Sequence, residues 1–414
     1  MPHNPHLLFL TSYAPSTERP RAYNILRGLA RHFRVSLIAQ VRSAREHEAV
    51  EAMRDHCDLV EAVALSRRRA LLNCLLHLAT PVPLRAAYFF NPRMKRAIAR
   101  RLAVDRYDIV HVEHLMAAHF AAGLRGPVRS FDAIDSIARL QAKILRFARS
   151  PLDRLISLEE LPKVRRYEPR LCRRFDCVLV STELDREALR APNARVIPNG
   201  VDLDYYRPSA AEPEPNTIVF YGRLSYVANA EAIGWFLREI FPRVLADHPR
   251  TRLFVVGPSP PFAVRRMRHA ASDNVTVTGR VPDVRPYLQQ ARVVVCPMRF
   301  AIGTQNKILE PMATGIPVVA TSEAIAGMSC KSDHDLLLGD DPEAFARQVG
   351  RLLRDDALRA LIAGNGRDYV EKHHDWRVIV DDLAALYGEL VAQREGARRK
   401  DDGGRREEKG SESR

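Results

Sequence analysis

Lys307 and Glu310 are the residues whose types and spacing most directly indicate chemistry in this sequence. They lie three positions apart in the segment NKILEPMA, so a helix there would place both on one face. The preceding loop, Gly303-Thr304-Gln305-Asn306, can leave backbone N–H groups free at the helix start, where a nearby lysine completes a phosphate site. A carboxylate one turn further along can accept hydrogen bonds from sugar hydroxyls. The pattern indicates a nucleotide diphosphate pocket, although helices with a Lys and a Glu are also common in α/β proteins without one.

The elements that must position this pair are a loop, a helix and a buried strand. The apolar stripe of a helix packed on a sheet is formed by Ile308, Leu309, Met312 and Ala313. Gly315 ends that helix, and the apolar run at 318–320 predicts a buried strand. Other predicted strands of the second half end at Gly222, Gly257 and Gly279. Such strand ends along one edge of a sheet leave room for phosphate.

The stretch GTQNKILEPMATGIPVVAT, residues 303–321, resembles the donor-site signature of retaining GT-B glycosyltransferases of family 4. It is most similar to the exopolysaccharide-type branch associated with PEP-CTERM and exosortase systems, which reads roughly GTxNKxLEAMAxGxPVVAT. The resemblance implies that Glu310 holds the ribose hydroxyls of a donor nucleotide. The family pattern places another glutamate at position 302, where this chain has Ile302. We therefore expect Arg299, Thr304 or Lys307 to do part of the work of the missing carboxylate.

The same resemblance implies a cationic grip on the donor diphosphate. In the family, an arginine directly after a strand-ending glycine and a lysine about six residues on form this grip. Gly222 and Arg223 match the first part, but the lysine position falls on or near Asn229. A diphosphate leaving group develops negative charge as the glycosidic bond breaks, so a second cation is needed. We expect Arg223, Arg299 and Lys307 together to replace the usual pair.

The first half of the chain offers residues for the acceptor side. Arg19 and Arg21 follow the first predicted strand, where family members often carry a Gly-Gly pair, and could contact an anionic acceptor; solvated arginines at a helix start are the alternative. His114 lies at the crevice end of the strand at 108–112, as a general base or as a structural histidine. Asp135 and Ser136 match an acidic run of the polysaccharide branch, and for Asp135 the alternative is a cap of the helix that follows.

Composition limits the possible classes of protein. The chain has 414 residues, 46% of them hydrophobic, which suits two ordinary domains. We see neither a run of about 18 apolar residues nor a signal peptide, so we expect a cytoplasmic protein. The six cysteines show no zinc spacing and fit a reducing compartment. With no convincing DxD loop, we expect no metal and no cofactor.

The net charge of +14 is concentrated in the first half of the chain. Residues 1–207 contain 35 Lys and Arg against 22 Asp and Glu. Such a half can bind nucleic acid, an anionic membrane or an anionic substrate, and arginine-rich composition alone is the alternative. Nucleic acid ranks low because aromatic residues do not interleave with the basic ones. The basic and apolar stretch at 67–78 would suit peripheral contact with an anionic inner membrane, a core helix being the alternative.

The repeated βα units predict an α/β protein with two Rossmann-like domains facing across a cleft, the GT-B arrangement. We expect an acceptor-side domain at 1–207, a proline-rich linker at 208–216 and a donor domain at 217–375. A helix at 376–394 would cross back to the first domain. The charged tail at 395–414 should be disordered.

The resemblance implies a retaining glycosyltransferase that moves a sugar from a nucleotide-diphosphate sugar to a saccharide acceptor, in all expectation lipid-linked, in surface polysaccharide biosynthesis. Its implied mechanism is front-face, with the leaving phosphate taking the acceptor proton. The alternatives are a GT-B sugar-nucleotide epimerase and a catalytically weakened GT-B subunit. The expected catalytic residues are Arg223, Lys307 and Asp135. The expected donor-binding residues are Gly222, Arg299, Gly303, Thr304 and Glu310, and the acceptor-side residues are Arg21, His114 and Ser136.

Overall fold

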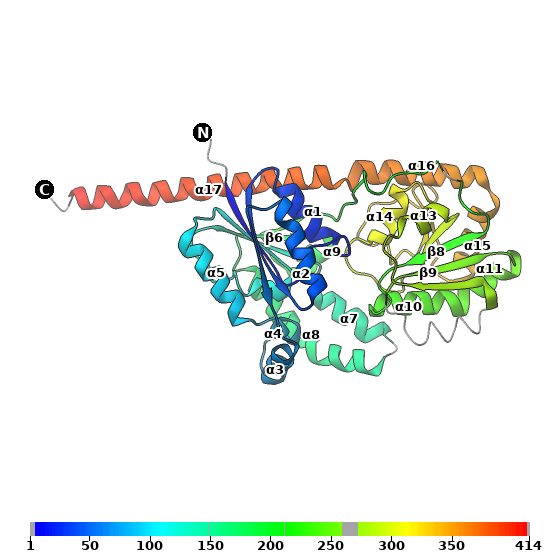
Figure 1. Ribbon diagram of the computed structural model, residues 1–414, viewed down its shortest axis with the longest axis horizontal. Coiled ribbons are helices and arrows are strands. Elements are labelled where there is room, and N and C mark those ends of the chain that lie inside the picture. The colour runs from blue at the N-terminus through cyan, green and yellow to red at the C-terminus, as the bar shows by residue number, and fades with distance from the viewer. Residues whose placement is uncertain (1–4, 149, 211, 259–271, 412–414) are drawn as a thin grey trace.

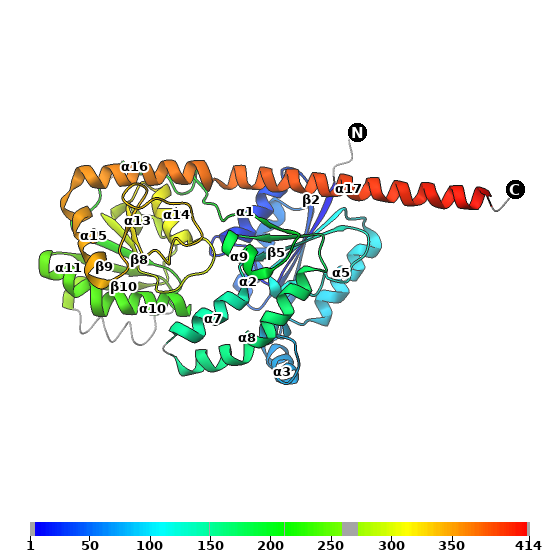
Figure 2. The same ribbon diagram turned by 180° about the vertical axis from the view of Figure 1, so that it is seen from behind.

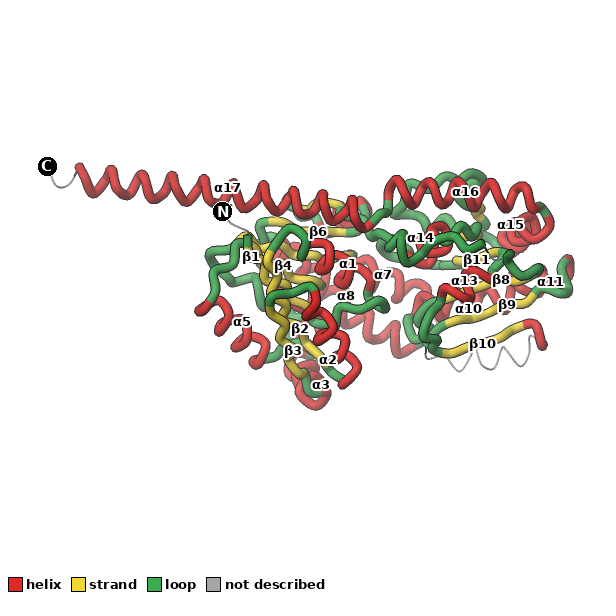
Figure 3. The backbone as a smooth tube through the Cα atoms, turned by 45° about the horizontal axis from the view of Figure 1, so that its top comes forward, coloured by secondary structure: helices red, strands yellow, loops and turns green. Residues whose placement is uncertain are grey.

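Two α/β domains lie side by side in the computed structural model, which describes residues 5–148, 150–210, 212–258 and 272–411 (Figure 1). Each domain is built on one parallel sheet with helices against it (Figure 3). The prediction of two Rossmann-like domains in the GT-B arrangement is confirmed. Within the described residues, no helix is long and apolar enough to span a bilayer.

The first domain contains a seven-stranded parallel sheet. In spatial order its strands are β3 (Leu59–Ala64), β2 (Arg34–Val41), β1 (His6–Thr11), β4 (Ile109–Glu113), β5 (Val128–Ile134), β6 (Cys177–Val180) and β7 (Ala194–Val196). All residues of β1, β4 and β6 are buried, as expected for parallel strands covered on both faces. The order reverses between β1 and β4, so the crevice of this domain opens at their carboxyl ends.

The second domain repeats the plan with a six-stranded parallel sheet. Its spatial order is β10 (Val275–Gly279), β9 (Arg252–Val256), β8 (Thr217–Tyr221), β11 (Val293–Cys296), β12 (Val318–Ala320) and β13 (Leu337–Leu338). The order reverses between β8 and β11. The strand ends of β8, β9 and β10 are the predicted glycines, so all three lie along one edge of the sheet.

Helices cover both sheets. The first domain has α1 (Pro20–Leu29), α2 (Ala44–Glu51), η1 (Ala52–Asp55), α3 (Arg67–His77), α4 (Leu84–Tyr88), α5 (Pro92–Val104), α6 (Leu115–Ala118), α7 (Ile137–Phe147), α8 (Pro151–Cys172) and α9 (Glu183–Leu189). The second has α10 (Val227–Trp235), η2 (Phe236–Ile240), α11 (Phe241–Asp247), η3 (Ser272–Asn274), α13 (Arg285–Gln290), α14 (Asn306–Ala313), α15 (Pro342–Arg354) and α16 (Asp356–His373).

The last helix, α17 (Trp376–Ser411), runs from the second domain back along the first (Figures 1 and 2). It packs on α1 so closely that a Cβ on Gly28 would lie 2.5 Å from Cγ1 of Val380. The buried Tyr387 hydroxyl donates to Ser130 Oγ at 2.8 Å and lies 2.6 Å from His111 Nδ1. This helix therefore fastens the end of the chain to the sheet of the first domain.

The expectation of a disordered tail from residue 395 is wrong for most of its length. The structure continues α17 as a helix to Ser411. The segment EGARRKDDGGRREEKGS is rich in Arg, Lys and Glu, which have high helix propensity. Because it extends a helix that already exists, it needs no new nucleation step.

Candidate active site

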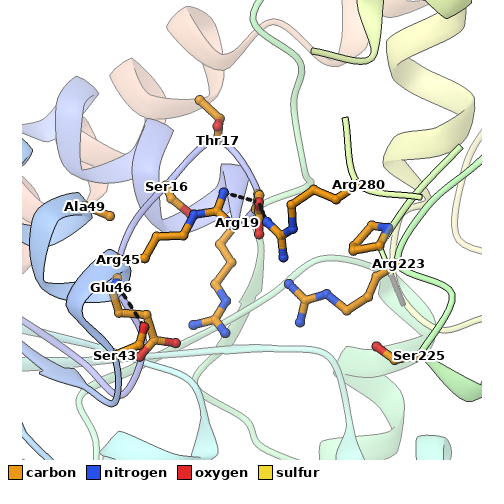
Figure 4. Close-up of a pocket in the computed structure, with 13 residues that line it drawn as sticks. Ser16, Thr17, Arg19, Ser43, Arg45, Glu46, Ala49, Arg223, Ser225 and Arg280 are labelled. Carbon is orange, nitrogen blue, oxygen red and sulfur yellow. Dashed lines mark hydrogen bonds and ion pairs between the residues drawn. The ribbon is translucent and has the colours of Figure 1, made fainter. Parts of the chain in front are cut away.

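A cleft between the two domains holds two adjoining cavities of about 530 Å³ each. We call the first the donor cavity; its lining includes Tyr206, Tyr221, Gly222, Lys307 and Glu310. We call the second the arginine cavity; its lining includes Arg19, Arg45, Arg223 and Arg280 (Figure 4). The guanidinium of Arg223 belongs to both linings. The loop before α1 closes the donor cavity from the first domain, with Thr17 and Glu18.

The floor of the donor cavity is backbone at the ends of β8 and β9. Gly222 has φ +145° and Gly257 has φ +151°. A Cβ added to Gly257 would lie only 1.9 Å from the carbonyl oxygen of Gly222. The close approach of the two strand ends therefore requires glycine at position 257, whereas a Cβ on Gly222 would lie 2.8 Å from Nδ2 of Asn229.

Lys307 reaches the donor cavity from the first turn of α14. Its Nζ donates to Oδ1 of Asn229 at 2.8 Å and to Oε1 of Gln305 at 3.3 Å. Burial lowers the pKa of Lys307, and no described carboxylate lies within ion-pair distance of its ammonium. Asn229, on α10, stands where the resemblance expects the second cation. The ammonium that the sequence lacks at that position is thus brought beside it from α14.

Glu310 lies one turn further along α14 and faces the same cavity. Its Oε2 accepts a hydrogen bond from the Tyr221 hydroxyl at 2.8 Å, and the Tyr206 hydroxyl is a second partner. Burial raises the pKa of Glu310 to about 7, although the two hydroxyls and Lys307 act in the opposite direction. The carboxyl group can therefore both accept and donate hydrogen bonds near neutral pH.

Asp135 contacts the loop at 303–306, which precedes α14 and which we call the donor loop, across the domain boundary. A Cβ on Gly303, which has φ +64°, would lie 2.0 Å from Asp135 Oδ1. The same oxygen accepts a hydrogen bond from Ser181 Oγ at 2.7 Å. Burial and the nearby Asp185 raise the pKa of Asp135 to about 7. Two residues that the sequence assigned to separate subsites thus touch each other, and glycine at position 303 is what allows it.

Arg21 is not available to an acceptor, so that expectation is wrong. Its side chain is buried, and its Nε and Nη2 donate to the carboxylate of Asp132 at 2.8 and 2.9 Å. Its Nη1 donates to the carbonyl of Ile197 at 2.9 Å and to Oδ1 of Asn199 at 3.0 Å. This arginine joins α1, β5 and the segment after β7. Arg19, two residues earlier, is the one that reaches the cleft.

Ser136 and His114 also lie outside both cavities. Ser136 is fully buried, caps α7 by accepting from the Arg139 N–H at 3.3 Å, and donates to Glu168 at 3.1 Å. Ser136 is therefore the helix cap, one residue after Asp135, for which capping was the alternative, and its side chain is not available to an acceptor. His114 has φ +72°, and its Nδ1 accepts from the N–H of Leu115. Burial lowers the pKa of His114 to about 4, so it is neutral at pH 7.

Of the remaining predicted donor residues, Arg299 does not line the donor cavity and Thr304 borders it. Arg299 is exposed, and its guanidinium lies 5.9 Å from the ring centre of Trp235. Its expected grip on the diphosphate stays a prediction. Thr304 is buried in the donor loop, and its Oγ1 has no hydrogen-bond partner within the residues described.

Sequence reasoning named Arg223 and Arg19 among the arginines that face the cleft, but it missed Arg45 and Arg280. Arg280 repeats the pattern of Arg223, an arginine directly after a strand-ending glycine, and this signal could have identified it. Arg45 on α2 carries no comparable signal, because only the docking of the two domains brings it to the cleft. In the part of the chain that the structure describes, no group of His, Cys, Asp or Glu could hold a metal ion.

Comparison with known proteins agrees with this architecture. Residues 21–205 match the family Glycosyltransferase Family 4, and residues 215–355 match Glycosyl transferases group 1. The lipopolysaccharide core biosynthesis mannosyltransferase LpcC of Rhizobium leguminosarum bv. viciae is 24% identical over 59% of this chain and 73% of its own length. The GDP-mannose-dependent monoacylated alpha-(1-6)-phosphatidylinositol monomannoside mannosyltransferase of Corynebacterium glutamicum is 25% identical over 47% of this chain and 56% of its own length.

The first curated relatives are matched over 18–56% of their own lengths. Among solved structures, Anabaena HepE in complex with UDP and glucose superimposes with a TM-score of 0.68 and 15% identity. The match covers 93% of this chain and 99% of HepE. At that identity the likeness establishes the fold alone. The two family matches, which together span residues 21–205 and 215–355, place the chain among the glycosyltransferases of the family 4 and group 1 type.

Proposed function

We propose that the protein transfers a sugar from a nucleotide-diphosphate sugar to an acceptor hydroxyl, with retention at the anomeric carbon. The observation that carries the proposal is the meeting of Lys307, Arg223 and Glu310 around one cavity at the carboxyl edge of the second sheet. Two cations and a carboxyl group at such an edge match the needs of a nucleoside diphosphate, which has charged phosphates and a ribose with two hydroxyls.

In the proposed mechanism, Lys307 and Arg223 bind the diphosphate, and Glu310 binds the ribose. The two cations stabilise the charge that develops on the leaving diphosphate as the glycosidic bond breaks. The leaving phosphate takes the proton of the acceptor hydroxyl on the same face, so no carboxylate nucleophile is needed at position 302. Asp135 lies against the donor loop and orients the acceptor. The residues present supply each of these roles without a metal ion.

We further propose that the acceptor is a lipid-linked saccharide of a surface polysaccharide pathway. Relatives named for lipopolysaccharide core biosynthesis and for a phosphatidylinositol mannoside support this choice. The exopolysaccharide branch stays a prediction from the signature at 303–321. The basic first domain suits an acceptor that carries phosphate.

The surface formed by α3 and α8 supports peripheral contact with an anionic membrane. These two helices lie side by side, and Nζ of Lys163 on α8 donates to the carbonyls of His77 and Leu78 at the end of α3 (Figure 2). Arg67, Arg68 and Arg69 are exposed at the start of α3. Large apolar side chains are exposed on both helices and just after α3: Leu71, Leu72, Leu75, Leu76, Leu78, Leu152, Leu155, Ile156 and Leu158. Exposed leucines beside arginines suit the interface of an anionic bilayer.

Sedimentation with vesicles tests the membrane contact. The wild-type protein should sediment with vesicles that contain phosphatidylglycerol. Most of a Leu75→Ser/Leu76→Ser variant should stay in the supernatant. The control, Val104→Ser, changes an equally exposed apolar residue on α5 and should leave binding unchanged. Equal binding of all three proteins would contradict the assignment to α3 and α8.

Product analysis with a labelled nucleotide sugar tests the transferase function itself. We expect label to appear in a membrane lipid fraction only when donor, protein and lipid are all present, and to fall strongly for Lys307→Ala. Isomerised or hydrolysed sugar formed with donor alone, and no labelled lipid, would instead support the epimerase alternative.

A further inference from the structure

The arginine cavity gathers four guanidinium groups from four separate segments. Arg19 comes from the loop before α1, Arg45 from α2, Arg223 from the end of β8 and Arg280 from the end of β10 (Figure 4). Two of them belong to the first domain and two to the second. Like charges so close together repel one another in the absence of an anion. The cavity is therefore built to hold negative charge.

The carboxylate of Glu18 lies at the mouth of this cavity. Its Oε1 accepts from Nη2 of Arg45 at 2.7 Å and also pairs with Nη1 of Arg280. One carboxylate oxygen thus bridges the two domains. All three side chains are exposed, and solvent screens ion pairs of this kind, so they contribute little to stability. An anionic ligand could displace Glu18 at little cost.

Glu18 leaves most of the positive charge unmatched. The other carboxylate of the lining, Glu46, is held by Arg42, which donates to it from the backbone N–H and from Nη2, both at 2.8 Å. Arg19 stacks on the ring of Tyr13, 3.8 Å from its centre, and its buried Nη1 has no hydrogen-bond partner among the residues described.

Arg223 has no recorded ion pair with a described residue either. Arg19 is therefore free to bind a ligand of this cavity, and Arg223 can contact both that ligand and the donor diphosphate. Since Arg223 also lines the donor cavity, a ligand that fills the arginine cavity lies beside the reacting sugar.

We propose that the arginine cavity binds a phosphate ester group of the acceptor, and that Glu18 occupies the site until that group displaces it. A phosphate offers several oxygens to several guanidinium forks at once, which one carboxylate cannot do. The assignment of the phosphate to the acceptor depends on the glycosyl transfer proposed above. The binding of phosphate to the cavity does not depend on it.

Calorimetric titration with inorganic phosphate, without nucleotide, tests the site. We expect Arg45→Gln and Arg280→Gln to weaken phosphate binding, because each removes one guanidinium group from the cavity. Glu18→Gln should tighten phosphate binding by about threefold to fivefold, because phosphate then no longer has to break an exposed ion pair. Glu51→Gln is the matched control, because Glu51 pairs with Arg54 on the exposed side of the neighbouring helix. It makes the same charge change and should leave the affinity unchanged.

Two outcomes would overturn the proposal. Equal tightening by Glu18→Gln and Glu51→Gln would mean that only overall charge matters. Phosphate binding that is lost in Lys307→Ala but kept in Arg45→Gln would place the ion in the donor cavity. Both outcomes are read without nucleotide or turnover, so they are distinct from a failure of the transferase proposal.

Two further titrations distinguish a soluble phosphate ester from a lipid-linked one as the ligand. Glucose 6-phosphate represents a soluble sugar phosphate, and a polyprenyl phosphate in detergent micelles represents a lipid-linked one. The true class should bind more tightly than inorganic phosphate and should respond to Glu18→Gln in the same way. If neither ester binds, the cavity does not accept a phosphate ester and the proposal is wrong.

Discussion

The two domains present the same edge of the same kind of sheet to the cleft, but they use it differently. In the second domain the strand ends are glycines, and Lys307 and Glu310 face an open cavity. In the first domain the corresponding polar residues, such as Arg21 and Ser136, are buried in internal hydrogen bonds. In the proposed assignment, the donor side is formed by the sheet edge itself. The acceptor side would be formed by arginines on loops and helices around that edge.

We expect polar residues at the carboxyl edge of the first domain's sheet to contribute mainly to the free energy of unfolding. Arg21→Ala leaves the buried carboxylate of Asp132 without its partner, which should cost about 3–5 kcal/mol of unfolding free energy. Arg34→Ala, which removes an exposed pair with Asp58, should cost far less, because solvent screens that pair. Denaturant unfolding compares the two. Similar losses would mean that Arg21 is not a structural clamp.

At the carboxyl edge of the second domain's sheet, replacing a basic residue with alanine should lower turnover rather than stability. Lys307→Ala should lower kcat by about 100-fold to 1,000-fold, because one preorganised charge at the leaving diphosphate is lost. The unfolding midpoint should barely change. Lys372→Ala, on the exposed face of α16, is the control and should keep full activity. A normal kcat in Lys307→Ala would remove this residue from the mechanism.

The glycine floor sharpens the contrast within the second domain. Gly257→Ala strains a backbone with positive φ, costs about 1–3 kcal/mol, and pushes against the carbonyl of Gly222. It should therefore also abolish nucleotide binding. Gly279→Ala strains a similar backbone at φ +73°, but no atom lies within 4 Å of its new Cβ. Calorimetry should find nucleotide binding retained in that control; its loss would mean that strain alone destroys the cavity.

The smallest expected effect is a pH dependence of donor binding. The pKa of Glu310 is raised to about 7, so its carboxylate is ionised above pH 7 and increasingly protonated below it. The ionised form accepts hydrogen bonds from both ribose hydroxyls. Binding of a nucleoside diphosphate should therefore weaken by up to about tenfold from pH 8 to pH 6. Glu310→Gln should remove this component, and an unchanged profile in that variant would assign the titration to another group.

Much of the second domain could be predicted because its signals are local. The glycine strand ends, the helix of Lys307 and Glu310, and the strand after Gly315 all follow from short stretches of sequence. The replacement of the missing lysine by Lys307 was also proposed from charge balance. Its contact with Asn229 joins positions 78 residues apart, so spacing alone could not establish it.

The first domain was harder to interpret because its polar residues find distant partners. Arg21 appears solvated at a helix start in the sequence, whereas Asp132, which buries it, lies 111 positions away. The pairing of Glu18 with Arg280 spans 262 positions and the domain boundary. Arg299 was assigned to the diphosphate by proximity in sequence, but its side chain lies toward Trp235. A residue type at a strand end predicts a role only when its partners are also near in sequence.

The most direct test of a donor site at the second sheet edge is calorimetric titration of UDP, GDP, ADP and CMP into the wild type and into Glu310→Ala. We predict that one nucleoside diphosphate binds the wild type and that Glu310→Ala lowers its affinity. Failure of all four to bind, or binding that the substitution leaves unchanged, would contradict the assignment of the donor cavity.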